Sequence, residues 1–167
     1  YKGVDVLLKA LAQVPEVSCV IVGEGPLKGN LVTLAAELGL ASRIRFLDPL
    51  PEDVYPAIYY CEDIFVLPSV ERTEAFGIVG WEAMAAGLPI LTTELGTGTS
   101  FYNRQSIDGI VCTPRSEKAL VNALNTTLSS PRAKKLGTEV RFDRFFSIGS
   151  EKKRYLELYN SACEDYR

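Results

Sequence analysis

Short apolar runs rich in β-branched residues alternate with amphipathic stretches along this chain, and this alternation constrains its fold more than any other feature. Residues 17–22 read Val-Ser-Cys-Val-Ile-Val and are followed by a glycine, which is typical of a strand buried on both faces. Similar strands are predicted at residues 44–47, 64–67, 89–92 and 110–111. Because strand and helix alternate five times, we expect a parallel sheet covered by helices on both faces.

Helical spacing of apolar residues fills the intervals between these strands. The predicted helices cover residues 1–14, 26–39, 51–60 and 76–86, one that starts at Ser116, and most of the chain from about residue 131. The second helix has an apolar stripe made by Leu27, Leu31, Leu34, Ala35 and Leu38, and the last has an inward stripe made by Tyr155, Leu158, Tyr159 and Ala162. The fold class is therefore α/β, a three-layer Rossmann-like domain with C-terminal helices, and residues 1–167 are expected to form one domain.

Composition excludes several classes of function. The net charge of −3 offers no basic excess for a nucleic-acid partner. The chain has no histidine, which excludes Ser-His and Cys-His catalysis and the usual zinc ligands, and no metal site is predicted. The four cysteines are scattered, as expected of reduced thiols in a cytoplasmic protein. No apolar run is long enough to span a bilayer, and the chain, which opens at Tyr1, is interpreted as a fragment of a longer protein.

Three chemically distinctive loops follow predicted strand ends, at residues 23–26, 72–77 and 96–100. The carboxyl ends of parallel strands open on one rim of the sheet, where ligands bind in such folds. The loop at residues 96–100 is glycine-rich, and contact with a phosphate or with another domain is as consistent with it as a plain turn. We therefore expect a ligand site on this rim.

The second loop carries the strongest signal. Glu74 is expected at the mouth of a helix with Phe76 and Gly77 in its first turn, where free backbone N–H groups bind anions. A helix end contributes only about 0.3–2 kcal/mol per anion, so a cationic side chain should assist. Glu82 is expected one turn beyond Ile78, where its carboxylate could accept hydrogen bonds from two neighbouring hydroxyls such as those of a ribose. Glu74 could do the same for a sugar.

Two other interpretations of this acidic pair are open from spacing alone. One is a helix with a carboxylate favoured by the dipole at its N-terminus and a second, solvated carboxylate. The other is a glycosidase pair, which is disfavoured because both acids lie on one short helix entrance instead of facing each other across a bond.

The run from Glu74 to Glu82 resembles the E-x7-E signature of the retaining glycosyltransferases of the GT-B fold, the group 1 family. Residues 82–90 resemble the family's EAMA-x-G-x-P-V segment, residues 20–26 its V-G-x-G-P turn, and residues 61–69 its A-D-x-x-x-x-P-S strand. Lys2-Gly3 resembles the K-G pair that opens the donor-binding domain. The resemblance extends over residues 2–159, with its motifs in the expected order.

The resemblance implies roles for particular residues. Lys2 and Glu74 would be the catalytic residues, Lys2 on the donor diphosphate and Glu74 on the transferred sugar, while Glu82 would hold the ribose. The other donor-binding positions would be the Gly23 turn, Leu50 beside the base, and the backbone of Ala75, Phe76, Gly77 and Ile78 around the phosphates. Some relatives carry a lysine near the position of Tyr55, so nucleotide contacts there are left open.

The implied activity is that of a retaining, metal-independent hexosyltransferase. It would use a UDP- or GDP-sugar as donor and no cofactor, with a carbohydrate or lipid-linked sugar as acceptor, in surface polysaccharide synthesis and with mannose favoured. An arginine and the N-terminal acceptor domain of the same chain would precede Tyr1, so the isolated chain should bind a nucleotide without turnover. A cytoplasmic location is implied, at the inner face of the membrane if peripheral membrane contact is made.

Two rival functions stay open. A nucleotide-sugar epimerase of the same architecture would use similar phosphate contacts but usually needs histidine, which this chain lacks. A non-catalytic binding module would be expected to lose Glu74 or Lys2, and both are present.

Four further features are assigned structural roles. Lys28 is interpreted as a solvated helix lysine in preference to a phosphate ligand, and Trp81 as a packing residue in preference to a base-stacking platform. The basic clusters at residues 134–135 and 152–154 are interpreted as solvated helix faces.

Overall fold

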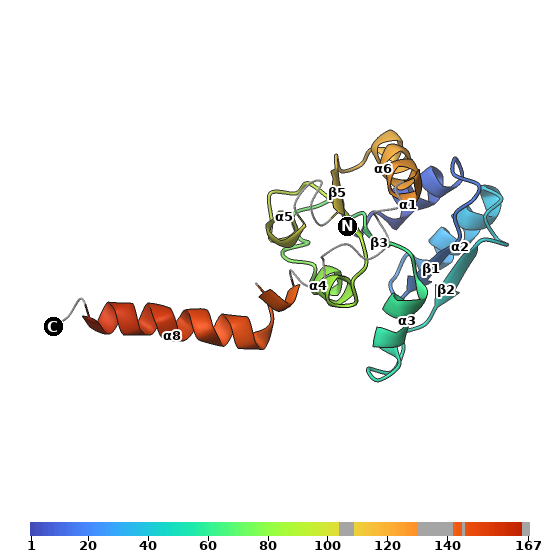
Figure 1. Cartoon of the computed structure of the whole chain (residues 1–167). Helices are drawn as coiled ribbons and strands as arrows, with labels where there is room; N and C mark the ends of the chain where they lie inside the picture. Colours follow the sequence, from blue (N-terminus) through green and yellow to red (C-terminus); the bar gives the residue numbers. More distant parts are fainter. Residues whose placement is uncertain (104–108, 130–141, 145, 165–167) are drawn as a thin grey trace.

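The computed structural model describes residues 1–103, 109–129, 142–144 and 146–164. Strands and helices alternate along the chain (Figure 1), as the sequence predicts. The strands are β1 (Cys19–Val22), β2 (Ile44–Leu47), β3 (Phe65–Leu67), β4 (Ile90–Thr93) and β5 (Gly109–Cys112). The helices are α1 (Val4–Leu11), α2 (Lys28–Glu37), α3 (Tyr55–Cys61), α4 (Ile78–Ala85), α5 (Thr99–Tyr102), α6 (Glu117–Ser129) and α8 (Ile148–Glu164).

All strand pairs are parallel. Strand β1 pairs with β2 from Cys19 opposite Ile44, and β4 pairs on either side with β3 and β5. The ladders among the described residues therefore form a two-stranded and a three-stranded sheet, where the sequence predicts one. Side chains of Ile21 on β1 and Val66 on β3 nevertheless pack against the same hydrophobic core, so the two sheets share one layer of packing.

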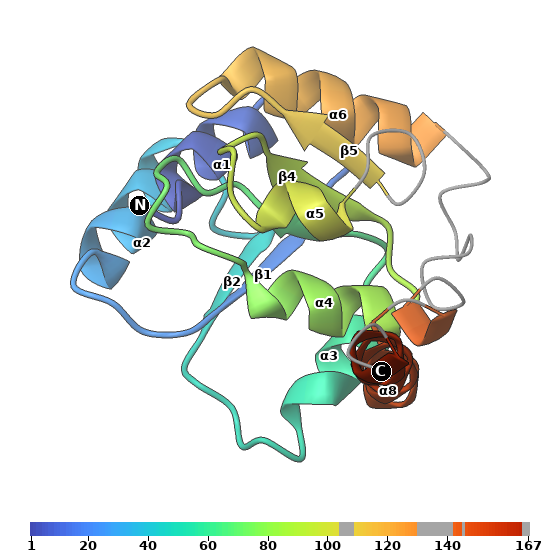
Figure 2. The same ribbon diagram turned by 90° about the vertical axis from the view of Figure 1, so that its left-hand side faces the viewer.

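Helices cover both faces of the strands. Neighbouring residues of β4 show this directly, because successive side chains of a strand point to opposite faces. Leu91 belongs to a core shared with α1, α2 and α6, whereas Ile90 belongs to a second core with Met84 of α4. Figure 2 shows α1 and α6 on one side of the strands and α3 and α4 on the other, which is the predicted three-layer arrangement.

Several predicted helix boundaries shift because backbone conformation overrides hydrophobic periodicity. Helix α4 begins at Ile78 and not at residue 76, because Gly77 at its N-cap has a left-handed backbone with φ of 72°. Helix α3 begins at Tyr55, after a turn over residues 51–54. The glycine-rich loop at residues 96–100 runs into a short helix that begins at Thr99. Ser116 does precede α6, and its hydroxyl accepts the N–H of Ala119 at 3.2 Å.

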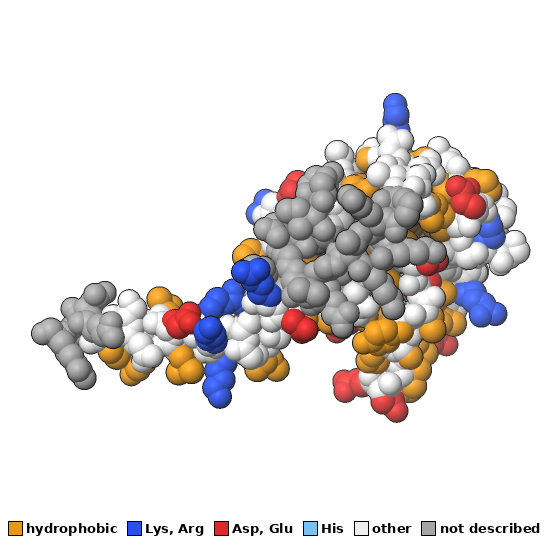
Figure 3. All heavy atoms as spheres, viewed as in Figure 1, with side chains coloured by type: hydrophobic (Ala, Val, Ile, Leu, Met, Phe, Trp, Pro, Cys, Tyr) orange, Lys and Arg blue, Asp and Glu red, His pale blue; other side chains and the backbone are white. Residues whose placement is uncertain are grey.

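Helix α8 contradicts the predicted inward stripe. It projects away from the body of the molecule (Figure 1), and the side chains of Tyr155, Leu158 and Tyr159 are 73%, 69% and 69% exposed. Hydrophobic side chains accordingly appear on the surface of this helix in Figure 3. Periodicity in the sequence defines an apolar face on this helix, but no other described part of the chain packs against that face. The side chain of Ala162 and the residues 134–135 lie outside the described part of the chain.

Smaller predictions are resolved in the same way. All four cysteine thiols are free. Cys19 is only partly buried. Leu27, predicted in the apolar stripe of α2, precedes that helix and is exposed. Lys28 is not merely solvated, since its Nζ lies 2.5 Å from Asp48 Oδ1. Among the described residues, no helix combines the length and hydrophobicity that a membrane crossing requires.

Candidate functional site

The turn that leads into α4 is held by close packing around Gly77. A Cβ atom at this position would lie 2.6 Å from Leu67 Cδ2 and 2.9 Å from the hydroxyl oxygen of Tyr102, in addition to the strain of its positive φ. The Tyr102 hydroxyl donates a hydrogen bond to the carbonyl oxygen of Gly77 at 3.1 Å. Only glycine therefore fits this turn without a shift of the end of β3 or of α5.

The backbone N–H groups at this turn are available to a ligand. Among the described residues, none accepts a hydrogen bond from the N–H of Phe76, Gly77 or Ile78. These are donors at a helix N-terminus, where the helix dipole favours negative charge. The predicted anion site stays a prediction, and the structure places Gly77 before the helix and not inside its first turn.

A second loop supports the first from the end of β4. The N–H of Gly98 donates to the Ala75 carbonyl at 2.8 Å, and the Thr97 hydroxyl donates to the Glu74 carbonyl at 2.9 Å. A Cβ atom on Gly98 would lie 2.3 Å from Phe76 Cδ2, so the two loops touch directly. The glycine-rich loop therefore holds the turn before α4 in place through hydrogen bonds to its carbonyl groups.

Lys2 and Glu74, which are 72 positions apart in the sequence, form an ion pair in the structure. Lys2 Nζ lies 2.6 Å from Glu74 Oε2, and the Ser69 hydroxyl donates to the same oxygen at 2.8 Å. The backbone carbonyl of Ser69 accepts in turn a hydrogen bond from the Thr93 hydroxyl. The Glu74 residue is only 6% exposed, so its charge is held by two donors in a nearly closed environment.

The electrostatics of Lys2 follow from this pairing. Partial burial by itself lowers the pKa of the Lys2 ammonium. The hydrogen bond and charge of Glu74, with a smaller contribution from Tyr1, together raise the pKa by more than burial lowers it, so the net pKa is raised. Lys2 is therefore a permanent cation at physiological pH. The predicted role of this cation, as a partner for an anion at the α4 turn, stays a prediction.

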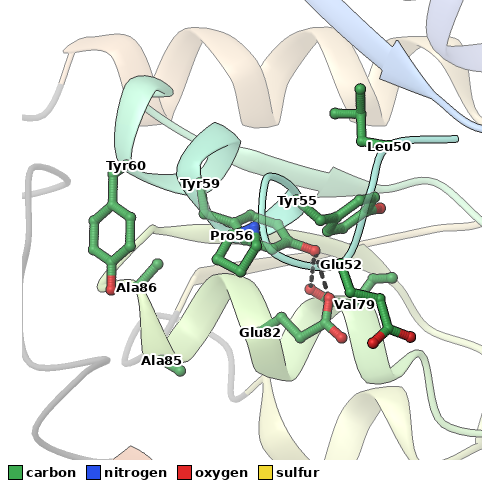
Figure 4. Close-up of a pocket in the computed structure, with 10 residues that line it drawn as sticks. All are labelled: Leu50, Glu52, Tyr55, Pro56, Tyr59, Tyr60, Val79, Glu82, Ala85 and Ala86. Carbon is green, nitrogen blue, oxygen red and sulfur yellow. Dashed lines mark hydrogen bonds between the residues drawn. The ribbon is translucent and has the colours of Figure 1, made fainter. Parts of the chain in front are cut away.

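A cavity of about 560 Å³ is lined by residues of α3 and α4. Leu50 and Glu82, predicted to contact a base and a ribose, both line this cavity (Figure 4). The remaining lining residues come from the turn before α3, from α3 and from α4, and are Glu52, Tyr55, Pro56, Tyr59, Tyr60, Val79, Ala85 and Ala86. Aromatic walls with few charged groups are typical of small-molecule sites.

The Glu82 carboxylate is exposed to this cavity and anchored at one oxygen. The Tyr59 hydroxyl donates to Glu82 Oε2 at 2.8 Å, and Figure 4 shows the two side chains facing each other. No described residue donates to the other oxygen, Oε1. A carboxylate with one open oxygen beside an apolar wall can accept hydroxyl groups of a ligand.

The structure shows the surroundings of the predicted site residues and also contacts that the sequence did not reveal. Gly23 ends β1 with a φ of 130° and donates its N–H to Leu47, and it is not among the residues that line the cavity. Tyr59, Ser69 and Tyr102 were missed, because their partners are 5 to 25 residues away and no local pattern marks the contact. Pro68-Ser69 in the strand motif was the one available signal for Ser69.

Trp81 packs as the sequence predicts. Its ring lies edge-on to Phe76 with centroids 4.7 Å apart and tilted against Phe146 at 5.3 Å. This aromatic cluster packs together with Met84 of α4 and Ile90 of β4. Trp81 is therefore a packing residue, and it is not among those lining the cavity.

A parallel α/β fold with open N–H groups at a helix N-terminus and a carboxylate in a nearby cavity is the arrangement expected of nucleotide-binding α/β domains. The sequence profile of the family "Glycosyl transferases group 1" matches residues 1–141. The chain therefore belongs to this family, and it corresponds to the C-terminal half of the GT-B fold.

Named relatives agree with this assignment. An O-antigen chain mannosyltransferase C of Escherichia coli is 34% identical over 98% of this chain and 44% of its own length. A D-rhamnosyltransferase of Pseudomonas aeruginosa is 36% identical over 88% of this chain and 39% of its own length. The chain thus spans less than half the length of these curated relatives.

Solved structures share the fold. An Anabaena protein crystallised in complex with UDP superposes with a TM-score of 0.84 at 25% identity, over 96% of this chain and 46% of that one. The C-terminal domain of a group 1 family protein from Francisella tularensis, crystallised on its own, superposes with a TM-score of 0.77 at 22% identity over 88% of this chain and 80% of that one.

Proposed function

We propose that this chain is the donor-binding domain of a retaining hexosyltransferase that uses a nucleoside diphosphate sugar. The observation that carries the proposal is the arrangement around α4. The N–H groups of residues 76–78, which no described residue accepts, follow Glu74 of the Lys2–Glu74 pair along the chain and precede Glu82, which lines the cavity together with Leu50. A diphosphate at the turn would have a sugar on the Glu74 side and a nucleoside on the Glu82 side.

The chemistry follows from where charge develops. The reaction breaks the bond between the anomeric carbon of the sugar and the diphosphate oxygen, and negative charge builds on the leaving phosphate. The acceptor hydroxyl oxygen forms the new bond to the anomeric carbon, and its proton passes to the leaving phosphate. Lys2 and the N–H groups of Phe76, Gly77 and Ile78 are the donors that would stabilise it. One well-placed donor of this kind contributes roughly 3–4 kcal/mol in the transition state. Glu74 then serves to hold sugar hydroxyls and need not act as a nucleophile.

The substrate class is proposed from the relatives. Mannosyl and rhamnosyl transfer appear in the names of two of them, one of which is an O-antigen enzyme. We place this protein in surface polysaccharide synthesis with a UDP- or GDP-sugar as donor, mannose favoured, and a carbohydrate or lipid-linked sugar as acceptor. The acceptor would be bound by an N-terminal domain of the same protein, so the present chain binds a donor without turnover.

Isothermal titration calorimetry with UDP, GDP and ADP tests the proposal. We expect at least one diphosphate to bind the folded chain in the micromolar to millimolar range, and Glu82→Ala and Lys2→Ala each to weaken it by about tenfold, as for a lost charge-assisted hydrogen bond. Glu157→Ala on the exposed α8 is the matched control and should change nothing. A folded wild-type chain that binds none of the three at millimolar concentration would refute the assignment.

A further inference from the structure

We propose that Tyr59 is a positioning residue, which holds the Glu82 carboxylate so that its free oxygen faces a cis-diol of the nucleotide ribose. This inference rests on the proposed function, because it concerns the nucleoside part of the same site. No hydroxyl of a ligand needs to touch Tyr59. Its effect is exerted through Glu82, whose carboxylate oxygen Oε2 lies 2.8 Å from the Tyr59 hydroxyl oxygen.

Tyr59 is well fixed by its surroundings. The residue is only 7% exposed, and its ring contacts Tyr55 and Phe65 edge-on, with centroids 5.8 and 6.0 Å apart. It packs in a small core with Ala83 and Leu88, which flank the end of α4. Its hydroxyl therefore reaches Glu82 from a rigid base on α3, and not from a mobile loop.

Glu82 by contrast is exposed and would otherwise sample several rotamers. A free glutamate side chain loses conformational entropy when it is ordered by a ligand, and an anchored one has already lost most of it. With Oε2 held by Tyr59, the carboxylate plane is set and Oε1 is left open toward the cavity in Figure 4. This is the preorganisation that recognition of two adjacent hydroxyls requires.

The direction of the hydrogen bond is also fixed. Burial raises the pKa of Tyr59 well above its usual range, and the hydrogen bond to Glu82 raises it further. The phenol stays protonated at every physiological pH, so it donates and the carboxylate accepts. The carbonyl of Val79 lies farther from the same hydroxyl, at 3.4 Å, and competes only weakly for its single proton.

A structural role and a positioning role for Tyr59 predict different effects of its removal on binding. Ligands with and without the ribose diol distinguish the two roles. If the hydroxyl only satisfies Glu82 or stabilises the fold, its removal should weaken binding of all nucleotides equally. If it positions Glu82 for the ribose, its removal should weaken only ligands that carry the diol. The readout is therefore the ratio of affinities for a nucleotide and its 2′,3′-dideoxy counterpart.

The experiment measures this ratio by calorimetry, with UDP and GDP and their 2′,3′-dideoxy forms as probes. We expect the wild-type chain to prefer the ribose form by about tenfold or more, since hydrogen bonds to charged groups are the stronger ones. Tyr59→Phe should reduce the preference to about threefold or less, while affinity for the dideoxy form stays within about twofold. Tyr155→Phe, the same change on the exposed α8, should leave both affinities unchanged.

Two further variants keep the test sharp if Tyr59→Phe does not fold. 4-Fluorophenylalanine at position 59 fills the space of the hydroxyl without donating and should lose the preference. 4-Aminophenylalanine retains a donor and should recover most of it. An unchanged ribose preference in the folded Phe or fluoro variant would overturn the inference, as would a wild-type chain that binds both ligand forms equally. A wild-type chain that binds no nucleotide at all would overturn both the proposed function and this inference.

Discussion

At the scale of single residues, Glu74 and Lys2 show how a buried charge is accommodated. The Glu74 carboxylate receives hydrogen bonds from Lys2 and Ser69, and its exposure of 6% leaves little room for water to replace either donor. Removing one donor therefore leaves charge in a poorly solvated place, which costs more than the pair contributes when intact. Lys2 is partly exposed, which moderates the effect.

We predict that Lys2→Ala lowers the free energy of unfolding at pH 7 by about 1–2 kcal/mol, measured by urea denaturation. Adding Glu74→Gln to Lys2→Ala should recover part of this loss, because the orphaned charge is removed. Lys9→Ala is the control, since its pair with Glu117 is 3.9 Å long and exposed, and it should cost no more than about 0.5 kcal/mol. Equal losses for both lysines would contradict the argument.

The pH dependence of the Lys2 contribution has a definite sign. The folded-state pKa of Lys2 is raised above its value in the unfolded chain, so its stabilising effect is fully present below the unfolded pKa. It is lost as the pH rises through the folded pKa. The difference between wild type and Lys2→Ala should accordingly stay constant from pH 7 to 9 and shrink in strongly alkaline solution.

At the scale of elements, Arg43 joins the end of α1, the connection into β1 and the start of β2. Its guanidinium donates to the carbonyls of Val14 and Val17 at 3.1 and 2.7 Å, and to that of Leu11 at 3.2 Å. These carbonyls belong to the end of α1 and to the connection into β1, whereas Arg43 immediately precedes β2. The planar fork of arginine reaches all three, which the single ammonium of lysine cannot do.

Arg43→Lys should therefore lower the free energy of unfolding by about 1–3 kcal/mol, because the carbonyls of this partly buried connection lose their hydrogen bonds to the guanidinium. Arg45→Lys is a matched control two residues away, on an exposed position of β2, and should lie within about 0.5 kcal/mol of wild type. Both values can be read from the same thermal or urea unfolding series. A loss at Arg43 no greater than at Arg45 would show that the three hydrogen bonds contribute little.

At the scale of the whole molecule, α8 stands apart from the three packed cores. Its apolar side chains are exposed, and none of the described residues of α8 belongs to a core cluster. Deleting residues 148–167 should leave the melting temperature of the remaining chain within about 4 °C of the full chain, because little buried surface is lost. Differential scanning calorimetry measures this directly. A fall of about 10 °C or more would mean that α8 packs on the body in solution.

Local patterns in the sequence were sufficient for the α/β class, the strand positions and the acidic motif, because each depends on residues close together in the chain. The runs at residues 19–22 and 90–93 are both strands, although β4 is buried throughout and β1, predicted to be buried on both faces, is only partly buried. Glu74, Glu82 and Leu50 could be singled out because the family resemblance places them by spacing, although their roles stay predictions.

Tertiary structure alone decided which residues meet. The contact between Lys2 and Glu74 spans 72 positions, the contact between Tyr59 and Glu82 spans 23, and nothing local marks either pair. It also decided that the strands divide into two sheets and that the stripe of α8 faces solvent. The physical reason is the same in each case: periodicity specifies that a face is apolar or a side chain charged, but only the packed chain specifies what lies opposite.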